Sequence, residues 1–142
     1  MRTAEEFFDF YHRVRWDLPG TYEERRTAEL KMFEDWYREM DVGDRVHIKL
    51  YTDVNPGTIV AKTKTTYTVR YDKATRDPNW KPEWIPGGFS AICTNDDEQK
   101  WIIEEDPNGR TETFRWSKRL NCFQHSGVKL LPGWAKYYDY NF

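Results

Sequence analysis

Cysteine is scarce in this chain, which carries only Cys93 and Cys122 among its 142 residues. Two cysteines are too few for a disulfide-stapled scaffold, because such scaffolds hold a small secreted domain together with several bridges. The N-terminus is rich in Glu and Phe and lacks the basic and apolar regions of a secretory leader. No apolar run approaches the roughly 20 residues that span a bilayer. We therefore expect a cytoplasmic protein with reduced thiols and no membrane partner.

Familiar catalytic signatures are also missing. The sequence has no Gly-rich phosphate loop, no Ser-centred elbow and no His-Glu-x-x-His helix. Cys122 and His125, with the distant Cys93 and His47, could supply zinc ligands, but structural zinc sites usually combine two closely spaced ligand pairs. The same Cys122 and His125 could act as nucleophile and base, but the sequence indicates no third group to orient them. We predict ordinary buried thiols and no metal site.

A third catalytic pattern is Glu98-x-Lys100, with Asp72 or Asp77 earlier in the chain. It resembles the acidic-x-Lys pattern of metal-dependent nucleases, in which two carboxylates hold Mg²⁺ and the Lys stabilises the attacking water. A three-residue match has little weight in a chain that is 32% charged. The sequence also does not indicate the helix-flanked mixed sheet that these enzymes use. We therefore expect no enzyme and no cofactor, with a metal-dependent nuclease as the third hypothesis.

Aromatic residues are what the chain does have. They make up 17% of a sequence that is only 38% hydrophobic, with seven Trp, nine Tyr and eight Phe. Each buried ring removes about 150–250 Å² from water, so a few large side chains can supply most of a core. A chain of this length can bury such a core in one domain. We predict a folded protein with some rings left over for a surface.

The N-terminal segment predicts two helices. Thr3 with Glu6, and Thr21 with Glu24, form two capping boxes. Helical spacing then places apolar residues on one stripe of each helix. The stripe of the first helix consists of Phe7, Phe10, Tyr11 and Val14. The stripe of the second helix consists of Leu30, Phe33, Tyr37 and Met40, and Trp36 lies beside this second stripe. We call residues 1–42 the helical arm and expect a helical hairpin that packs on the sheet. A dimer seam or a partner groove is the alternative.

After Gly43-Asp44 the apolar period changes to two, which predicts strands. The first has Val46, Ile48 and Leu50 on one face and Arg45, His47, Lys49 and Tyr51 on the other. We expect a turn at residues 55–57, strands at 58–62 and 67–71, and a long Pro- and Trp-containing loop at 72–88 that has a function. Further extended segments are expected at 89–93, 120–123 and 128–131, with the terminal rings of residues 134–142 closing an edge or plugging the barrel.

Residues 98–118 predict a long β-hairpin. Two alternating segments, 99–103 and 111–116, flank the turn residues Asp106-Pro107-Asn108-Gly109. Asp106 can accept a hydrogen bond from the backbone that follows, and Gly109 can supply a positive φ. The predicted fold class is α+β, with an N-terminal helical hairpin at residues 1–42 and a small antiparallel β-barrel or strongly bent sheet at residues 43–142.

The start of the predicted barrel resembles a known fold. Gly43-Asp44-Arg45-Val46 opens one strand and Pro56-Gly57-Thr58-Ile59-Val60 opens the next. These roughly thirty residues are similar to SH3-like barrels of the KOW and Tudor type. That resemblance implies a fold rather than a function, because such barrels bind RNA, DNA or peptides.

Three further segments carry a second resemblance. They are residues 80–89 (WKPEWIPGGF), 106–110 (DPNGR) and 137–142 (YYDYNF). In this order they make residues 43–142 similar to a family of small proteins encoded by bacteriophages and prophages. The resemblance implies an accessory protein that acts in the bacterial host cytoplasm by binding and blocking host machinery. It carries over no catalytic or binding residue, and the helical arm departs from it, because the family members start near the equivalent of Met40.

The net charge of −2 conceals a segregated pattern. Residues 1–44 hold seven Lys or Arg against twelve Asp or Glu, whereas residues 45–81 hold eight against three. Cations interleaved with rings suit phosphates and stacked bases. The candidate residues for binding nucleic acid or another ligand are Arg45, Lys49, Lys62, Lys64, Arg70, Arg76, Trp80, Lys81 and Trp84. The alternative is a solvated sheet face with the Trp residues folded into the core.

The function that these patterns favour is binding without catalysis. We expect a phage-encoded protein that engages nucleic acid or a nucleic-acid-handling host complex, as an inhibitor of a bacterial defence system in the manner of an anti-CRISPR protein. Acidic residues of the helical arm could instead imitate a phosphate backbone toward a basic protein, the candidates being Glu23, Glu24, Glu34 and Asp35. The runner-up is an oligomeric protein that sequesters a small molecule such as a nucleotide, held by Trp80, Trp84 and neighbouring Arg residues.

Overall fold

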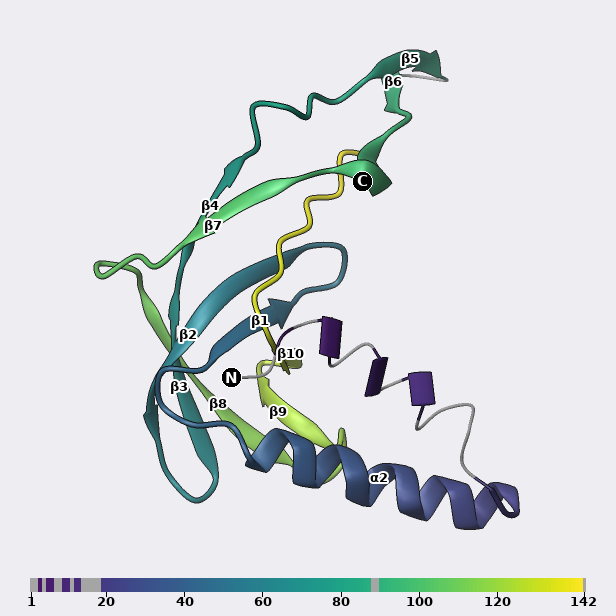
Figure 1. Cartoon of the computed structure of the whole chain (residues 1–142), viewed down its shortest axis with the longest axis vertical. Coiled ribbons are helices and arrows are strands. Elements are labelled where there is room, and N and C mark those ends of the chain that lie inside the picture. Colours follow the sequence, from purple (N-terminus) through teal and green to yellow (C-terminus); the bar gives the residue numbers. More distant parts are fainter. Residues whose placement is uncertain are drawn as a thin grey trace.

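Six antiparallel strands close into a barrel in the computed structural model. The structure describes residues 3, 5–6, 9–10, 12–13, 19–87 and 90–141. For Phe33, Trp36 and Ser90 it describes only the backbone. Around the barrel the strands follow the order β1-β10-β9-β8-β3-β2 (Figure 1). Their bounds are β1 (Arg45–Lys49), β2 (Val54–Lys62), β3 (Thr66–Tyr71), β8 (Thr111–Ser117), β9 (Cys122–His125) and β10 (Val128–Pro132). Closure leaves no open strand edge in this sheet. The predicted small antiparallel barrel is confirmed.

Strand β1 follows the expected alternation, with one departure. Val46 and Ile48 are fully buried in the barrel. His47, expected on the outer face, is also buried, at 2% exposed, because Gly133 of the segment after β10 covers it. The His47 Nδ1 lies 2.8 Å from the Gly133 carbonyl oxygen. Leu50, expected inside, is 38% exposed because the strand ends one residue earlier.

The turn expected at residues 55–57 is wrong. These residues lie within β2, where Pro56 pairs with His47 of β1. The chain turns earlier, with the Leu50 N–H donating to the Asp53 carbonyl at 2.9 Å. Gly57 is needed for close packing instead, because a Cβ there would lie 2.6 Å from Cγ1 of Val69.

The helix α2 (Tyr22–Arg38) confirms the second capping box, since the Thr21 side chain accepts a hydrogen bond from the Glu24 N–H at 3.2 Å. The C-terminal end of α2 docks on the barrel. Tyr37 and Met40 are part of the buried core, and the hydroxyl of Tyr67 donates to both of their carbonyls, at 2.8 and 3.1 Å. The expectation that the second helix packs on the sheet is confirmed at this end.

The first predicted helix falls mostly outside the described residues, as do Phe7, Tyr11, Val14 and Phe142. Its capping box is present, with the Glu6 N–H donating to Oγ1 of Thr3 at 3.1 Å. Phe10 is buried and belongs to the core cluster of the barrel. The helical hairpin itself stays a prediction.

The hairpin expected at residues 98–118 is wrong. Strand β7 (Trp101–Glu104) pairs with β4 (Lys73–Arg76), while β8 pairs with β3 and β9. The turn exists, since the Gly109 N–H donates to the Asp106 carbonyl at 3.0 Å, but it joins two different sheets. Gly109 does not adopt the expected positive φ; it is required because a Cβ would collide with the Tyr71 carbonyl oxygen.

Residues 72–106 form an excursion between β3 and β8 that we call the β-insertion. Besides β4 and β7 it holds a second ladder, β5 (Trp84–Gly87) with β6 (Ser90–Cys93), and the 3-10 turn η1 (Asp96–Glu98). The loop expected at residues 72–88 therefore contains two short strands. The β-insertion extends away from the barrel, and the C-terminal tail, residues 134–141, runs beside it (Figure 1). The tail pairs with β2 through Val54 and Tyr137 rather than plugging the barrel.

Candidate functional site

The fold separates charge more sharply than the sequence suggests. The two barrel segments, residues 45–71 and 107–133, together hold ten Lys or Arg against two Asp or Glu. The β-insertion holds four against nine. The basic stretch predicted at residues 45–81 therefore spans two units of opposite charge, and the barrel is the basic one.

Two of the predicted barrel cations are used internally. Lys62 Nζ donates to the Met40 carbonyl at 2.8 Å and lies 3.3 Å from Asp41 Oδ1, so it caps the end of the helical segment. Arg70 Nη2 lies 3.2 Å from Asp72 Oδ1 and 3.7 Å from a carboxylate oxygen of Glu105. Both cations hold the fold together.

The other three predicted barrel cations do not gather. The Arg45 guanidinium lies over the Trp134 ring, 3.8 Å from its centroid. Lys64 is exposed in the turn after β2, whereas Lys49 is exposed beside the beginning of β2, where it pairs with Val54. Lys49 and Lys64 therefore lie toward opposite ends of the barrel.

Barrel closure places a different set of polar residues beside Lys49. Lys49 is the direct cross-strand partner of Lys129, Lys129 of Gln124, and Gln124 of Arg115. We call Lys49, Lys129, Gln124 and Arg115 the outer row, because it runs across β1, β10, β9 and β8 on the outside of the barrel. Neighbouring strands lie about 4.8 Å apart, so Lys49 and Lys129 are adjacent, whereas Arg115 lies two strands beyond Lys129, about 10 Å away.

The outer row is exposed and uncompensated. The side chains of Lys49, Lys129 and Arg115 are exposed, and among the described residues no carboxylate lies within ion-pair distance of them. Like charges directly opposite one another on paired strands repel. A bound anion would therefore reduce the electrostatic repulsion between Lys49 and Lys129.

An exposed aromatic residue lies in the connection between β1 and β2, just beyond the outer row. Tyr51 follows Lys49 by two residues and is 94% exposed. A ring held in solvent beside cations can stack on an unpaired base, since stacking tolerates any base. Sequence reasoning placed Lys49 and Tyr51 together but missed Lys129, Gln124 and Arg115, because they join Lys49 only through pairing of β1 with β10.

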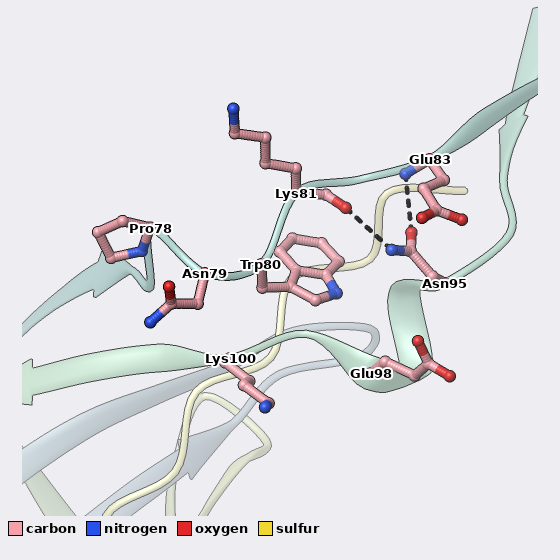
Figure 2. Close-up of a pocket in the computed structure, with 8 residues that line it drawn as sticks. All are labelled: Pro78, Asn79, Trp80, Lys81, Glu83, Asn95, Glu98 and Lys100. Carbon is pink, nitrogen blue, oxygen red and sulfur yellow. Dashed lines mark hydrogen bonds between the residues drawn. The ribbon is translucent and has the colours of Figure 1, made fainter.

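The predicted residues of the β-insertion do come together, around a residue of the tail. The rings of Trp80 and Trp84 lie 5.6 and 6.1 Å from the Tyr140 ring, and Arg76 Nη1 lies 3.5 Å from its hydroxyl. Beside them is an open groove of about 750 Å³ (Figure 2). It is lined by Pro78, Asn79, Trp80, Lys81, Glu83, Asn95, Glu98 and Lys100. Tyr140 was missed as a site residue because it is far along the chain.

Two of the four acidic candidates of the helical arm are paired with cations on α2. Glu34 pairs with Arg38 at 3.0 Å and Asp35 with Lys31 at 2.8 Å, and the Asp35 carboxylate raises the pKa of Lys31. Glu23 and Glu24 are exposed in the first turn. The helix α2 holds five acidic residues against four basic ones, so it is a poor imitation of a phosphate backbone.

The zinc and nucleophile hypotheses find little support in the geometry. Cys122 lies in β9 of the barrel and Cys93 in β6 of the β-insertion, and both are buried. Among the residues that the structure describes, no three His, Cys, Asp or Glu side chains gather as metal ligands would. Burial raises the pKa of the Cys122 thiol, which keeps it protonated and unreactive at neutral pH.

The structure separates the two forms of the nuclease pattern, the one with Asp72 and the one with Asp77. The Asp72 side chain is fully buried and accepts hydrogen bonds from the Trp134 indole and the Asp106 N–H, each at 3.1 Å. Those bonds leave it unavailable to a metal ion. Asp77 does come near Lys100, because its N–H donates to the Lys100 carbonyl at 2.9 Å.

Comparison with known protein families, with curated proteins and with solved structures gave no match. Within the described residues, no helix has the length and apolar character needed to cross a membrane. The site is therefore interpreted from its own geometry.

Proposed function

We propose that this protein binds nucleic acid through the outer wall of its barrel, and that it acts by binding rather than by catalysis. The observation that carries the proposal is the exposed Lys49–Lys129 pair, extended across the barrel by Arg115. Two lysines directly opposite each other repel in the free protein. Phosphates placed between them would convert that repulsion into attraction and release counterions.

The surroundings of the outer row favour a single strand over a duplex. Tyr51 offers an exposed ring next to Lys49, and a ring can stack only on a base that is accessible. Each such stack contributes about 1–3 kcal/mol and depends little on base identity. Gln124 adds a polar side chain between Lys129 and Arg115. We therefore expect binding with weak sequence preference and strong dependence on salt.

The resemblance to phage-encoded proteins suggests the setting of this activity. A basic barrel could attach the protein to the nucleic acid of a host complex, for example a defence system, and block it. The phosphate-mimic alternative is less favoured, because Glu34 and Asp35 are paired on α2. Nucleotide sequestration between Trp80 and Trp84 is also less favoured, because these rings belong to the acidic β-insertion.

Fluorescence anisotropy with a labelled single-stranded oligonucleotide of about 20 nucleotides tests the proposal. The variant Lys49→Glu/Lys129→Glu/Arg115→Glu should lose affinity by about a hundredfold or more at low salt. The variant Lys73→Glu/Lys81→Glu/Lys100→Glu changes the net charge equally, at exposed positions of the β-insertion, and should bind within a few-fold of the unaltered protein. Equal losses in both variants would contradict the proposal.

A further inference from the structure

We propose that the groove of the β-insertion is a second binding site, which takes a basic, partly apolar segment of a protein partner. In this site the Trp80 indole donates a hydrogen bond to a backbone carbonyl of that segment. The site lies on the β-insertion and does not depend on nucleic-acid binding by the barrel.

The Trp80 indole is the observation that points to a ligand. Trp80 is 6% exposed, and its buried Nε1–H has no acceptor among the described residues. Trp101 and Trp134, in contrast, donate to Gln99 Oε1 at 2.7 Å and to the Gly57 carbonyl at 3.0 Å. An indole is a donor only, and a buried donor without an acceptor costs free energy. Trp80 is therefore set up for an acceptor that comes from outside the chain.

The groove is a gap in a two-stranded ribbon. The β4–β7 ladder ends where the Asp77 N–H donates to the Lys100 carbonyl, and pairing resumes where the Thr94 N–H donates to the Glu83 carbonyl, both at 2.9 Å. Between these points the Asn95 side chain bridges the two connections. It accepts from the Glu83 N–H at 2.8 Å and donates to the Lys81 carbonyl at 2.9 Å.

The side chains around Trp80 leave its N–H facing the gap. Figure 2 shows the indole nitrogen directed toward the space between Asn95 and Glu98, with the Lys81 side chain pointing away from the ring. Glu98 is exposed, so its side chain can move aside when an acceptor approaches.

The charge of the β-insertion decides which ligand fits. Glu83 and Glu98 line the groove together with Lys81 and Lys100, so the acidic excess comes from the rest of the β-insertion, including Asp96 and Asp97 in the adjacent turn η1. The nine acidic residues of the β-insertion against four basic ones attract a cationic segment and repel a polyanion. Lys or Arg side chains of the partner can pair with Glu83 and Glu98 while a neighbouring carbonyl accepts from Trp80.

An apolar surface continues the site beyond the groove. On the β5–β6 ladder the direct cross-strand partners Ile85 and Ile92 are 50% and 46% exposed on one face. Trp84, which is 48% exposed, lies on the opposite face, because successive residues of a strand alternate. Exposed apolar groups on an acidic β-insertion match a segment in which basic and apolar residues alternate. This matching of charge and apolar surface is what specifies the partner.

The test is NMR of the full chain with ¹⁵N-labelled tryptophan, and the probe is a capped decapeptide of alternating Arg and Leu. The Trp80 indole signal, assigned from its loss in Trp80→Phe, should shift on titration, whereas the Trp101 signal should not. Trp80→Phe should weaken binding of the peptide about five-fold, as expected for one hydrogen bond. Glu83→Gln/Glu98→Gln should weaken binding of the peptide by more than about five-fold at low salt. This double variant keeps the Trp80 indole, so it tests the proposal if Trp80→Phe does not fold.

Two control probes separate the possible occupants. A capped decapeptide of alternating Glu and Leu and the single-stranded oligonucleotide should leave the Trp80 signal unmoved. A Trp80 signal that stays fixed at saturating Arg–Leu peptide would overturn the proposal. A signal that the oligonucleotide moves and the peptide does not would also overturn it, because the groove would then take a polyanion.

Discussion

The side chain of Asn141 pairs with both backbone groups of Cys93, accepting from its N–H at 2.7 Å and donating to its carbonyl at 2.9 Å. Gln99 does the same for Tyr138, accepting from its N–H at 2.8 Å and donating to its carbonyl at 2.9 Å. The side-chain amides thus make the pair of hydrogen bonds that a neighbouring strand would make, and they join the C-terminal tail to the β-insertion. The order of the groove and of the rings around Tyr140 depends on this connection.

Replacing Asn141 should loosen the β-insertion without loosening the barrel. In Asn141→Ala the Cys93 N–H loses its acceptor, and its hydrogen exchange should accelerate about tenfold. Amides of β1, β3 and β8 should keep their exchange rates, as should the whole chain in the exposed control Asn79→Ala. Acceleration throughout the barrel would show that the two parts unfold together.

Asp72 should be the most sensitive polar residue where barrel, β-insertion and tail meet. Its buried carboxylate accepts hydrogen bonds from the side chains of Thr58, Arg70 and Trp134 and from the Asp106 N–H. Asp72→Asn removes the charge that Arg70 faces and should lower the free energy of unfolding by about 3 kcal/mol in urea denaturation. The exposed control Asp97→Asn should stay within about 0.5 kcal/mol of the unaltered protein. A similar small effect at Asp72 would contradict its role.

His47 should make the free energy of unfolding depend on pH. Burial lowers the pKa of His47 in the folded protein below its ordinary value of 6.5, so the unfolded chain binds more protons between these two pKa values. The contribution of His47 is therefore complete above pH 6.5 and is lost as the pH falls through that window, by up to about 1.4 kcal/mol per pH unit. Urea unfolding of His47→Asn should show a shallower dependence of the unfolding free energy on pH just below pH 6.5 than the unaltered protein and the exposed control His125→Asn. Equal slopes in all three would contradict it.

Gly109 should tolerate no side chain, for a reason of packing. A Cβ at this position would collide with the carbonyl oxygen of Tyr71, which is backbone and cannot move aside alone. Gly109→Ala should cost about 2 kcal/mol in the free energy of unfolding, whereas the exposed turn control Asn108→Ala should cost much less. A tolerated Gly109→Ala, measured by urea denaturation, would show that the turn relaxes easily.

Local features of the fold could be predicted from the sequence. The cap of α2 at Thr21 follows from adjacent residues. The inward positions of Val46 and Ile48 follow from a period of two. These predictions hold because each depends on chemistry within a few residues of chain.

The prediction of which strand pairs with which failed at residues 98–118. Residues 99–103 and 111–116 alternate and flank a real turn, but β8 finds β3 instead, because pairing with β3 closes the barrel. The same closure brings Lys129 beside Lys49, and the returning tail brings Tyr140 beside Trp80. The partners in each pair are far apart in the sequence, so no local pattern predicts that Lys129 joins Lys49 or that Tyr140 joins Trp80.

The salt dependence of oligonucleotide binding tests the central claim most directly. Each phosphate contact to a single strand contributes about 0.7 to the slope of log affinity against log salt. Lys49→Gln/Lys129→Gln should therefore reduce that slope by about 1.4, whereas Lys64→Gln/Lys81→Gln, with the same change in net charge, should leave it unchanged. Equal slopes in both double variants would contradict the assignment of the outer row as the nucleic-acid site.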